Sequence, residues 1–242
     1  MTQIGITERG DAALNLEWYN WVLANKPTIL ITKNPKKLIE DFKNNSGKSI
    51  FDFNVILHAT ITGLGRTVME PNVSAWKEQA EYLKENFNER IVIRVDPIVP
   101  LFAEKQLEVF KWFIVNTDYL RYRTSIMDFY NHVKTRLPPK INSLLEPIYG
   151  SGIHASFDTR QKIINDINDI LFEKNVTVEV CGEPGIKCSG CVSENDCKIL
   201  GVEPSLSKKG QRYGCSCLAN KQELLTSKHQ CEHRCAYCYW KN

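Results

Sequence analysis

The sequence predicts an α/β protein with a partial or complete (β/α) barrel of about six parallel strands and a cysteine-rich C-terminal segment. Three observations lead to this prediction. Short apolar stretches alternate with stretches of helical periodicity, which is typical of βαβ units and a parallel sheet. Of the 242 residues, 43% are apolar, enough for one large core. All nine cysteines follow residue 180, so we expect a barrel body over 1–181 and a cysteine-rich segment over 182–242, packed on the same domain.

The expected strands are apolar stretches rich in isoleucine, valine and threonine. In chain order they are residues 3–7, 28–32, 54–62, 91–95, 122–129 and 177–181. Periodicity does not distinguish a barrel from an open sheet. Neither a G-x-G-x-x-G nor a G-x4-G-K-S/T motif opens the first helix, which argues against a dinucleotide-binding or P-loop protein.

Helices are expected between these strands. Asn34 should cap a helix that Pro35 opens. Residues 8–26 and 156–175 should also be helical, the latter with a capping box from Asp158 to Gln161. Apolar residues that recur every three or four positions mark the helical faces: Leu14, Trp18, Trp21 and Val22; Trp76, Ala80, Leu83 and Phe87; Leu107, Phe110 and Ile114.

Polar side chains stand at or after the end of each expected strand. They are Glu8, Arg9, Asp11, Thr32, Lys33, Asn34, Thr60, Thr62, Arg94, Asp96, Ser125, Asp128, Glu179 and Glu183. The carboxyl ends of parallel strands meet at one edge, where barrel enzymes carry their chemistry. Singly, each residue has a structural interpretation, because Asn34 could only cap a helix and Asp96 could only shape a turn before Pro97. The ring of residues as a whole predicts a functional site.

The chain has a formal net charge of +3, which neither requires nor excludes a nucleic-acid partner. The N-terminal residues lack the basic start and apolar run of a signal peptide, and no apolar run is long enough to span a bilayer. We therefore expect a soluble, cytoplasmic protein without a membrane partner. In reducing cytosol, clustered cysteines more often bind metal than form disulfides.

Cys231, Cys235 and Cys238 have the spacing C-x3-C-x2-C. Three thiolates so spaced can hold three irons of a [4Fe–4S] cluster and leave the fourth iron open to a ligand. Structural zinc is the main alternative, with His229 or His233 as a fourth ligand. Zinc pairs usually show C-x2-C twice, however, and the aromatics of CAYCYW would shield a redox cluster from solvent.

The stretch ELLTSKHQCEHRCAYCYW resembles the cluster motif of the radical SAM superfamily. The chain also resembles a narrower family, domain-of-unknown-function family 1848. The blocks that carry this resemblance are ITKNP (31–35), TITG (60–63), EPNV (70–73), IRVDPI (93–98), SIMDFY (125–130), VCGE (180–183), QRYGCSC (211–217) and CEHRCAYCY (231–239). In the superfamily the cluster motif follows the first barrel strand, whereas here it comes last.

The resemblance implies a circularly permuted radical SAM barrel. Cys231, Cys235 and Cys238 would hold the [4Fe–4S] cluster, and S-adenosyl-L-methionine (SAM) would bind its open iron. An electron from a donor such as flavodoxin or ferredoxin would lead to SAM cleavage, and the resulting 5′-deoxyadenosyl radical would abstract hydrogen from the substrate. The implied catalytic residues are Arg9, Asp11, Lys33, Arg94, Asp96 and Asp128, and the implied cofactor contacts are Asn34, Thr60, Thr62, Ser125 and Tyr237.

The remaining cysteines suggest a second metal site. The family pattern includes Cys181, Cys188, Cys215 and Cys217, which we take as its ligands, whereas Cys191 and Cys197 lie outside that pattern. The metal could be an iron–sulfur cluster or zinc.

The substrate is not specified by the sequence. A nucleotide or nucleic-acid base is our first expectation, and a peptide or small metabolite the second. A basic surface could attract phosphate, formed by Lys33, Lys36, Lys37, Lys208, Lys209 and Arg212. The alternative to an enzyme is a non-catalytic zinc or iron–sulfur binding module that docks nucleic acid or protein.

Overall fold

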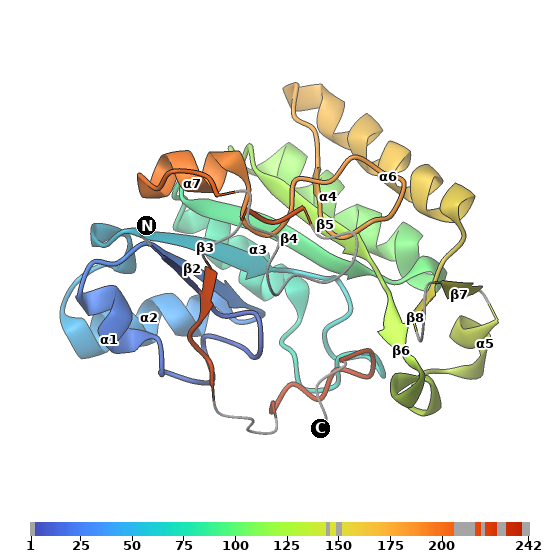
Figure 1. The fold of residues 1–242 in the computed structure, drawn as a ribbon, viewed down its shortest axis with the longest axis horizontal. Coiled ribbons are helices and arrows are strands. Elements are labelled where there is room, and N and C mark those ends of the chain that lie inside the picture. Colours follow the sequence, from blue (N-terminus) through green and yellow to red (C-terminus); the bar gives the residue numbers. More distant parts are fainter. Residues whose placement is uncertain are drawn as a thin grey trace.

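The structure is a computed structural model that describes residues 3–143, 146–148, 152–205, 216–218, 221–226 and 231–238. It has an α/β fold in which seven parallel strands form one curled, half-barrel sheet (Figure 1). The strands are β1 (Ile4–Ile6), β2 (Thr28–Thr32), β3 (Val55–Thr60), β4 (Ile91–Ile98), β5 (Tyr122–Ile126), β9 (Glu179–Val180) and β10 (Lys221–Glu223). The predicted barrel-like parallel sheet is thus confirmed, as a half-barrel.

The order of the strands across the sheet is β10-β1-β2-β3-β4-β5-β9. β10 pairs with β1 in register Ile4 to Lys221, and β1 pairs with β2 in register Gly5 to Thr28. A strand from the end of the chain therefore lies beside a strand from its beginning, and the others follow in sequence order. The order of the strands in space is obtained from their order in the sequence by moving the last strand, β10, to the front.

The main helices are α1 (Tyr19–Leu23), α2 (Pro35–Ser46), α3 (Trp76–Glu85), α4 (Ala103–Asn116), α6 (Phe157–Leu171) and α7 (Glu194–Leu200). As predicted, Asn34 caps α2 by accepting from the backbone N–H of Lys37, and Pro35 occupies the first turn. Gly47, with φ of +68°, ends this helix in the left-handed conformation that glycine adopts without strain. Within the described part of the chain, no helix has the length and apolar character needed to cross a membrane.

Several expected elements differ from those observed. Residues 8–18 form turns instead of the first half of a helix, because Asp11 bonds to the end of β2 and Asn15 caps its own turn at the Glu17 N–H. Phe87 lies beyond the end of α3 and is exposed. The cap of α6 is Ser156, not a box from Asp158, since the Ser156 hydroxyl accepts from the Thr159 N–H.

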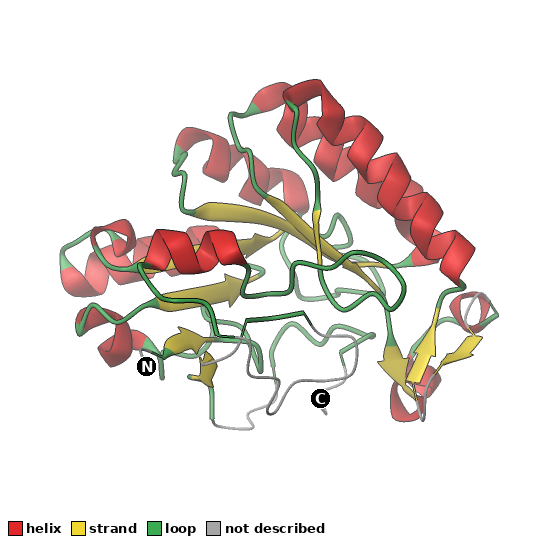
Figure 2. Ribbon diagram, turned by 45° about the horizontal axis from the view of Figure 1, so that its top comes forward, coloured by secondary structure: helices red, strands yellow, loops and turns green. Residues whose placement is uncertain are grey.

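A second, three-stranded antiparallel sheet was not predicted. It consists of β6 (Phe129–Tyr130), β8 (Gly152–His154) and β7 (Glu146–Ile148), and it stands apart from the main sheet beside the short α5 (Pro139–Asn142) (Figure 2). Its strands have two or three residues each, too few for a periodicity to be recognised.

The two faces of the main sheet have different covers. On one face, Leu30, Leu57 and Ile93 pack with apolar residues of α2, α3, α4 and α6. On the other face, the inner one, Ile29 and Ile56 pack with Cys181, Cys191 and Cys217 and with residues of α7. The segment predicted as 182–242 thus supplies both a cover for the inner face and one strand, β10, of the sheet itself.

Candidate functional site

The cysteine loop, residues 231–238, lies at the carboxyl ends of the parallel strands. Its Ala236 N–H donates to the Met69 carbonyl over 2.9 Å, and the Asn72 amide donates to the Glu232 carbonyl over 2.6 Å. His233 Nε2 lies 2.8 Å from a carboxylate oxygen of Asp11. The loop therefore contacts the segments that follow β1 and β3, where barrel enzymes carry their sites.

Asp11 joins this loop to the end of β2. Its carboxylate accepts from the Thr32 hydroxyl at 2.6 Å and from the Lys33 backbone N–H at 2.7 Å, in addition to its contact with His233. Burial by itself would raise the pKa of Asp11, but His233 and these two donors together lower it. Asp11 is therefore a charged, buried anchor for the cysteine loop.

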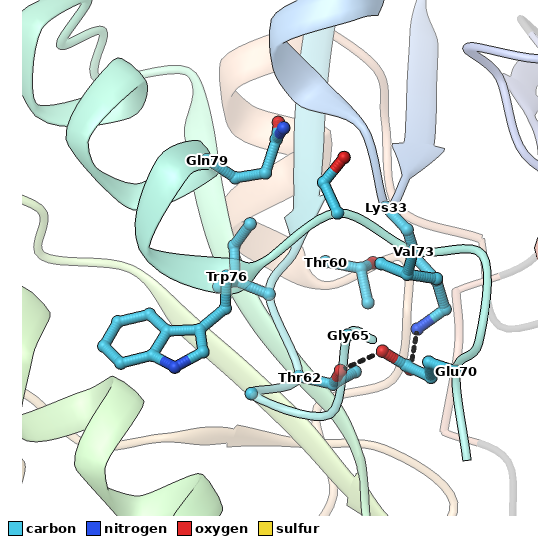
Figure 3. Close-up of a pocket in the computed structure, with 11 residues that line it drawn as sticks. Lys33, Thr60, Thr62, Gly65, Glu70, Val73, Trp76 and Gln79 are labelled. Carbon is cyan, nitrogen blue, oxygen red and sulfur yellow. Dashed lines mark hydrogen bonds and ion pairs between the residues drawn. The ribbon is translucent and has the colours of Figure 1, made fainter. Parts of the chain in front are cut away.

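Glu70 is the centre of a second buried network. Its carboxylate lies 2.8 Å from the Lys33 ammonium and accepts from the Thr62 hydroxyl at 2.5 Å (Figure 3). It also accepts from the Tyr237 hydroxyl. Burial opposes the charge of both partners, yet the ion pair lowers the pKa of Glu70 and raises that of Lys33. Lys33 also lies over the Tyr237 ring, 5.5 Å from its centroid. Strand ends β2 and β3 are thereby connected to the cysteine loop.

A small pocket opens beside this network. Its lining includes Lys33, Thr60, Thr62, Gly65, Glu70 and Trp76 (Figure 3), and its cavity volume is about 10 Å³. That is about the volume that one water molecule needs and far below the 300 to 1,000 Å³ common for ligand pockets, so the pocket in this conformation does not hold a larger ligand. The Thr60 hydroxyl is buried without a hydrogen-bond partner among the described residues. Buried polar atoms are rarely left unpaired, so this hydroxyl suits a polar ligand.

Arg94, Asp96 and Ser125 form a third group, in the second half of β4 and near the end of β5. Arg94 and Asp96 form an ion pair, and the Ser125 hydroxyl donates to Asp96 at 2.5 Å. Burial would lower the pKa of Arg94, but Asp96 and the neighbouring Cys191 and Cys181 raise it, so the guanidinium stays charged. Within the described structure, its Nε is a second buried atom without a hydrogen-bond partner.

The thiols of the cysteine loop lie in a shielded environment. Cys235 is buried, whereas Cys231 and Cys238 are partly exposed. Burial, opposed by Lys33 and assisted by Glu70 and Cys238, raises the pKa of Cys235 to about 12. Burial is also the main cause that raises the pKa of Cys231, and Cys238 adds to it, so Cys238 lies within electrostatic range of both Cys231 and Cys235.

A second group of cysteines is more compact. The sulfur atoms of Cys181, Cys191 and Cys217 all lie within 4.8 Å of one another, and each residue is buried. Among the described residues, this is the one set of three potential metal ligands that is so close. The three cysteines could hold a metal ion or an iron–sulfur cluster.

The composition of this group differs from the prediction. Cys191, which lies outside the family pattern, occupies the position expected for Cys188. The Cys188 thiol instead closes a turn, where it accepts from the Glu183 N–H at 3.2 Å. Gly190 has a left-handed backbone, with φ of +75°, and this turn directs Cys191 toward Cys217. Cys215 lies outside the described residues.

The other predicted site residues lie in three places. Asp11, Lys33, Thr60 and Thr62 lie beside the cysteine loop, which contains Tyr237, or line the pocket, and Arg94, Asp96 and Ser125 lie together at the next two strands. Arg9 and Asp128 are exposed, and the Asn34 side chain caps α2.

The predicted basic surface is only partly described. Lys33 turns inward to Glu70, Lys37 pairs with Asp41 on the surface of α2, and Lys36 lies over the ring of Tyr82. Lys208, Lys209 and Arg212 lie outside the described residues. A nucleotide or nucleic-acid substrate therefore stays a prediction.

Two residues of the site were not predicted in their roles. Glu70 lies ten positions beyond β3 in a long loop, so it does not stand at a strand end, although it opens the EPNV block. His233 was considered only as a zinc ligand, whereas here it contacts Asp11.

A family model matches most of the chain. The model of a family described as a domain of unknown function, DUF1848, matches residues 24–240. Neither a curated protein nor a solved structure gave a significant match. The matched region includes β2 to β10, the pocket and both groups of cysteines. This chain belongs to the DUF1848 family.

Proposed function

We propose that this protein is a radical SAM enzyme, with a circularly permuted barrel and a [4Fe–4S] cluster held by Cys231, Cys235 and Cys238. The observation that carries the proposal is the position of the cysteine loop. It follows β10, an edge strand of a curled parallel sheet, and it contacts the carboxyl ends of the neighbouring strands. A cluster loop of this kind belongs after the first strand of the barrel, and β10 becomes that strand once the sheet is read in spatial order.

The thiols of the cysteine loop suit a multi-iron cluster better than a single ion. One ion brings its sulfur ligands within about 4 Å of each other, given metal–sulfur bonds of about 2.3 Å. Cys231, Cys235 and Cys238 are described but are not such a compact set. A cluster in which each thiolate binds its own iron accommodates wider spacing. The Lys33 ammonium, close enough to affect Cys235, would offset part of the negative charge of the thiolates.

Bound there, the cluster and SAM would supply the electron transfer and the 5′-deoxyadenosyl radical that abstracts hydrogen from the substrate. The chain itself would bind the cluster and SAM and orient them. Asp11 and Glu70 fix the loop through His233 and Tyr237, and the buried Tyr237 ring helps to exclude water. Lys33 keeps its proton at Nζ because Glu70 faces it.

The unpartnered polar atoms provide the contacts that a ligand would complete. The Thr60 hydroxyl and Arg94 Nε lie at the ends of β3 and in β4, and both are buried without a partner among the described residues. We assign them to SAM or to the substrate. The substrate class remains a nucleotide or nucleic-acid base, and the electron donor a flavodoxin or ferredoxin.

The test is made on protein purified and reconstituted without oxygen. We expect about four irons per chain and formation of 5′-deoxyadenosine after dithionite and SAM are added. Cys238→Ala should lose the iron of this cluster and SAM binding together, whereas Cys197→Ala, at a buried cysteine of α7, should keep both. SAM binding that survives in the iron-free Cys238→Ala protein would refute an open iron and favour a non-catalytic binding module.

A further inference from the structure

The second group of cysteines is built from three separate segments. Cys181 follows β9, Cys191 follows the turn at Gly190, and Cys217 belongs to the segment 216–218. The sulfur atoms of Cys181 and Cys191 are 3.2 Å apart, well beyond the S–S bond length of about 2.05 Å. Three buried thiols so close to one another, without a disulfide between Cys181 and Cys191, point to a shared ligand.

The surroundings keep these sulfur atoms in place. The Cys191 N–H donates to the Cys217 sulfur at 2.9 Å, and the Leu218 N–H donates to the Val192 carbonyl at 2.9 Å, so the two segments lie side by side. The Cys191 carbonyl accepts from the fully buried Arg123 at 2.9 Å. Hydrogen bonds of this kind orient metal ligands in known sites.

The charges around the group favour a bound cation with thiolate ligands. Three thiolates around a divalent ion leave a net charge of −1. The Arg94 guanidinium and the Lys221 ammonium both lie within electrostatic range of Cys191, and the carboxylate of Glu8 pairs with Lys221 at 2.8 Å. Because Glu8 pairs with Lys221 and Asp96 pairs with Arg94, these cations would offset only part of the charge of the negative centre.

We propose that Cys181, Cys191 and Cys217 bind one divalent ion of the zinc class, which fixes the cysteine-rich segment to the inner face of the sheet. Tetrahedral zinc with bonds of about 2.3 Å places its sulfur ligands about 3.8 Å apart. The observed separations lie on either side of that value, from 3.2 Å between Cys181 and Cys191 to at most 4.8 Å. A cluster that gives each thiolate its own iron would need more space. Binding releases the protons of the three thiols.

This inference does not rest on the proposed function, because it uses none of the thiols of the cysteine loop. Its role is structural. The ion would join the end of β9 to two segments that cross the inner face, where Ile29, Ile56 and Val92 lie. The ion would also help to fix the position of Arg94, which lies near Cys191 and forms an ion pair with Asp96 in β4.

The first test compares two serine variants of the whole chain by metal analysis. Wild-type protein should carry about one zinc per chain, Cys191→Ser should lose it, and Cys188→Ser should keep it. Iron content and 5′-deoxyadenosine formation are measured in the same samples, so failure of the radical SAM proposal would be seen separately. Zinc lost from Cys188→Ser but kept by Cys191→Ser, or iron in place of zinc at this group, would overturn the inference.

A second measurement needs no variant and so does not depend on how a variant folds. X-ray absorption at the zinc edge of the wild-type protein should show three or four sulfur neighbours at about 2.3 Å. Nitrogen or oxygen neighbours alone, or wild-type protein without zinc, would equally overturn the inference.

Discussion

The buried ion pair between Lys33 and Glu70 gives a prediction whose size follows from burial. Glu70→Gln removes the charge and keeps the shape, so the Lys33 ammonium loses its counter-ion. The two side chains are 15% and 0% exposed, so water screens the pair poorly. Removing one partner of a buried pair costs about 3 to 5 kcal/mol.

That loss converts to a shift in melting temperature. For a protein of this size each kcal/mol is worth about 2 to 4 °C, so Glu70→Gln should lower Tm by about 6 to 20 °C. The Tyr237 hydroxyl loses a charged acceptor in the same change, so iron content should also decrease. The double variant Lys33→Met with Glu70→Gln should recover much of the stability, because no unpaired charge remains.

The matched control is Glu108→Gln on α4. Glu108 pairs with Lys111 at 2.8 Å, the same distance as in the buried pair, but these side chains are 54% to 59% exposed. An exposed pair contributes about 0 to 1 kcal/mol, so Tm should change by less than about 4 °C. Thermal unfolding of the wild type and the three variants, at matched metal content, is the assay. Equal shifts in Tm for Glu70→Gln and Glu108→Gln, or a double variant no more stable than the single one, would show that burial does not strengthen the Lys33–Glu70 pair.

Three further predictions use the same assays. Thr60→Val should leave Tm unchanged or raise it, because a buried hydroxyl without a partner among the described residues is removed. The same change should weaken SAM binding by about 1 kcal/mol, or about fivefold. An unchanged affinity for SAM would exclude a contact between this hydroxyl and SAM. Gly190→Ala should lose zinc, because the added Cβ would lie 2.4 Å from a backbone nitrogen of residue 217. Gly201→Ala, with open space around the added Cβ, should keep zinc and only lower Tm slightly. Equal zinc contents in the two variants would contradict the predicted clash at Gly190. Burial would raise the pKa of Asp196, but Arg123, His58, Arg121 and the Ser193 N–H together lower it. The stabilising contribution of Asp196 is therefore complete above the unfolded pKa of about 3.8 and is lost as pH falls through the folded pKa. The Tm difference between wild type and Asp196→Asn should therefore be largest near neutral pH and shrink in acid, and a difference independent of pH would contradict it.

The sheet was predictable where burial is uniform. β2 begins and ends where TILIT does, because every residue of it is buried and Asn34-Pro35 starts a helix directly afterwards. β10 is short, and its residues Lys221, Gln222 and Glu223 are polar, so periodicity could not identify it. Only its pairing with β1 makes it a strand.

The candidate site was predictable where it depends on strand ends. Asp11, Lys33 and Thr62 lie together because parallel strands finish at the same edge. The position of Glu70 was not predictable, because Glu70 lies in a long loop after β3 that brings it back to that edge. Spacing in sequence could not select Cys191 over Cys188 either, since the left-handed turn at Gly190 decides which thiol faces Cys217.

SAM cleavage at the cysteine loop is tested by the amount of 5′-deoxyadenosine that oxygen-free, reduced protein forms per chain, compared with Cys238→Ala. The wild type carrying about four irons should form this product, and the variant should form none. Intact SAM in the presence of a fully loaded, reduced cluster, or a wild type that binds zinc and no iron, would contradict this prediction.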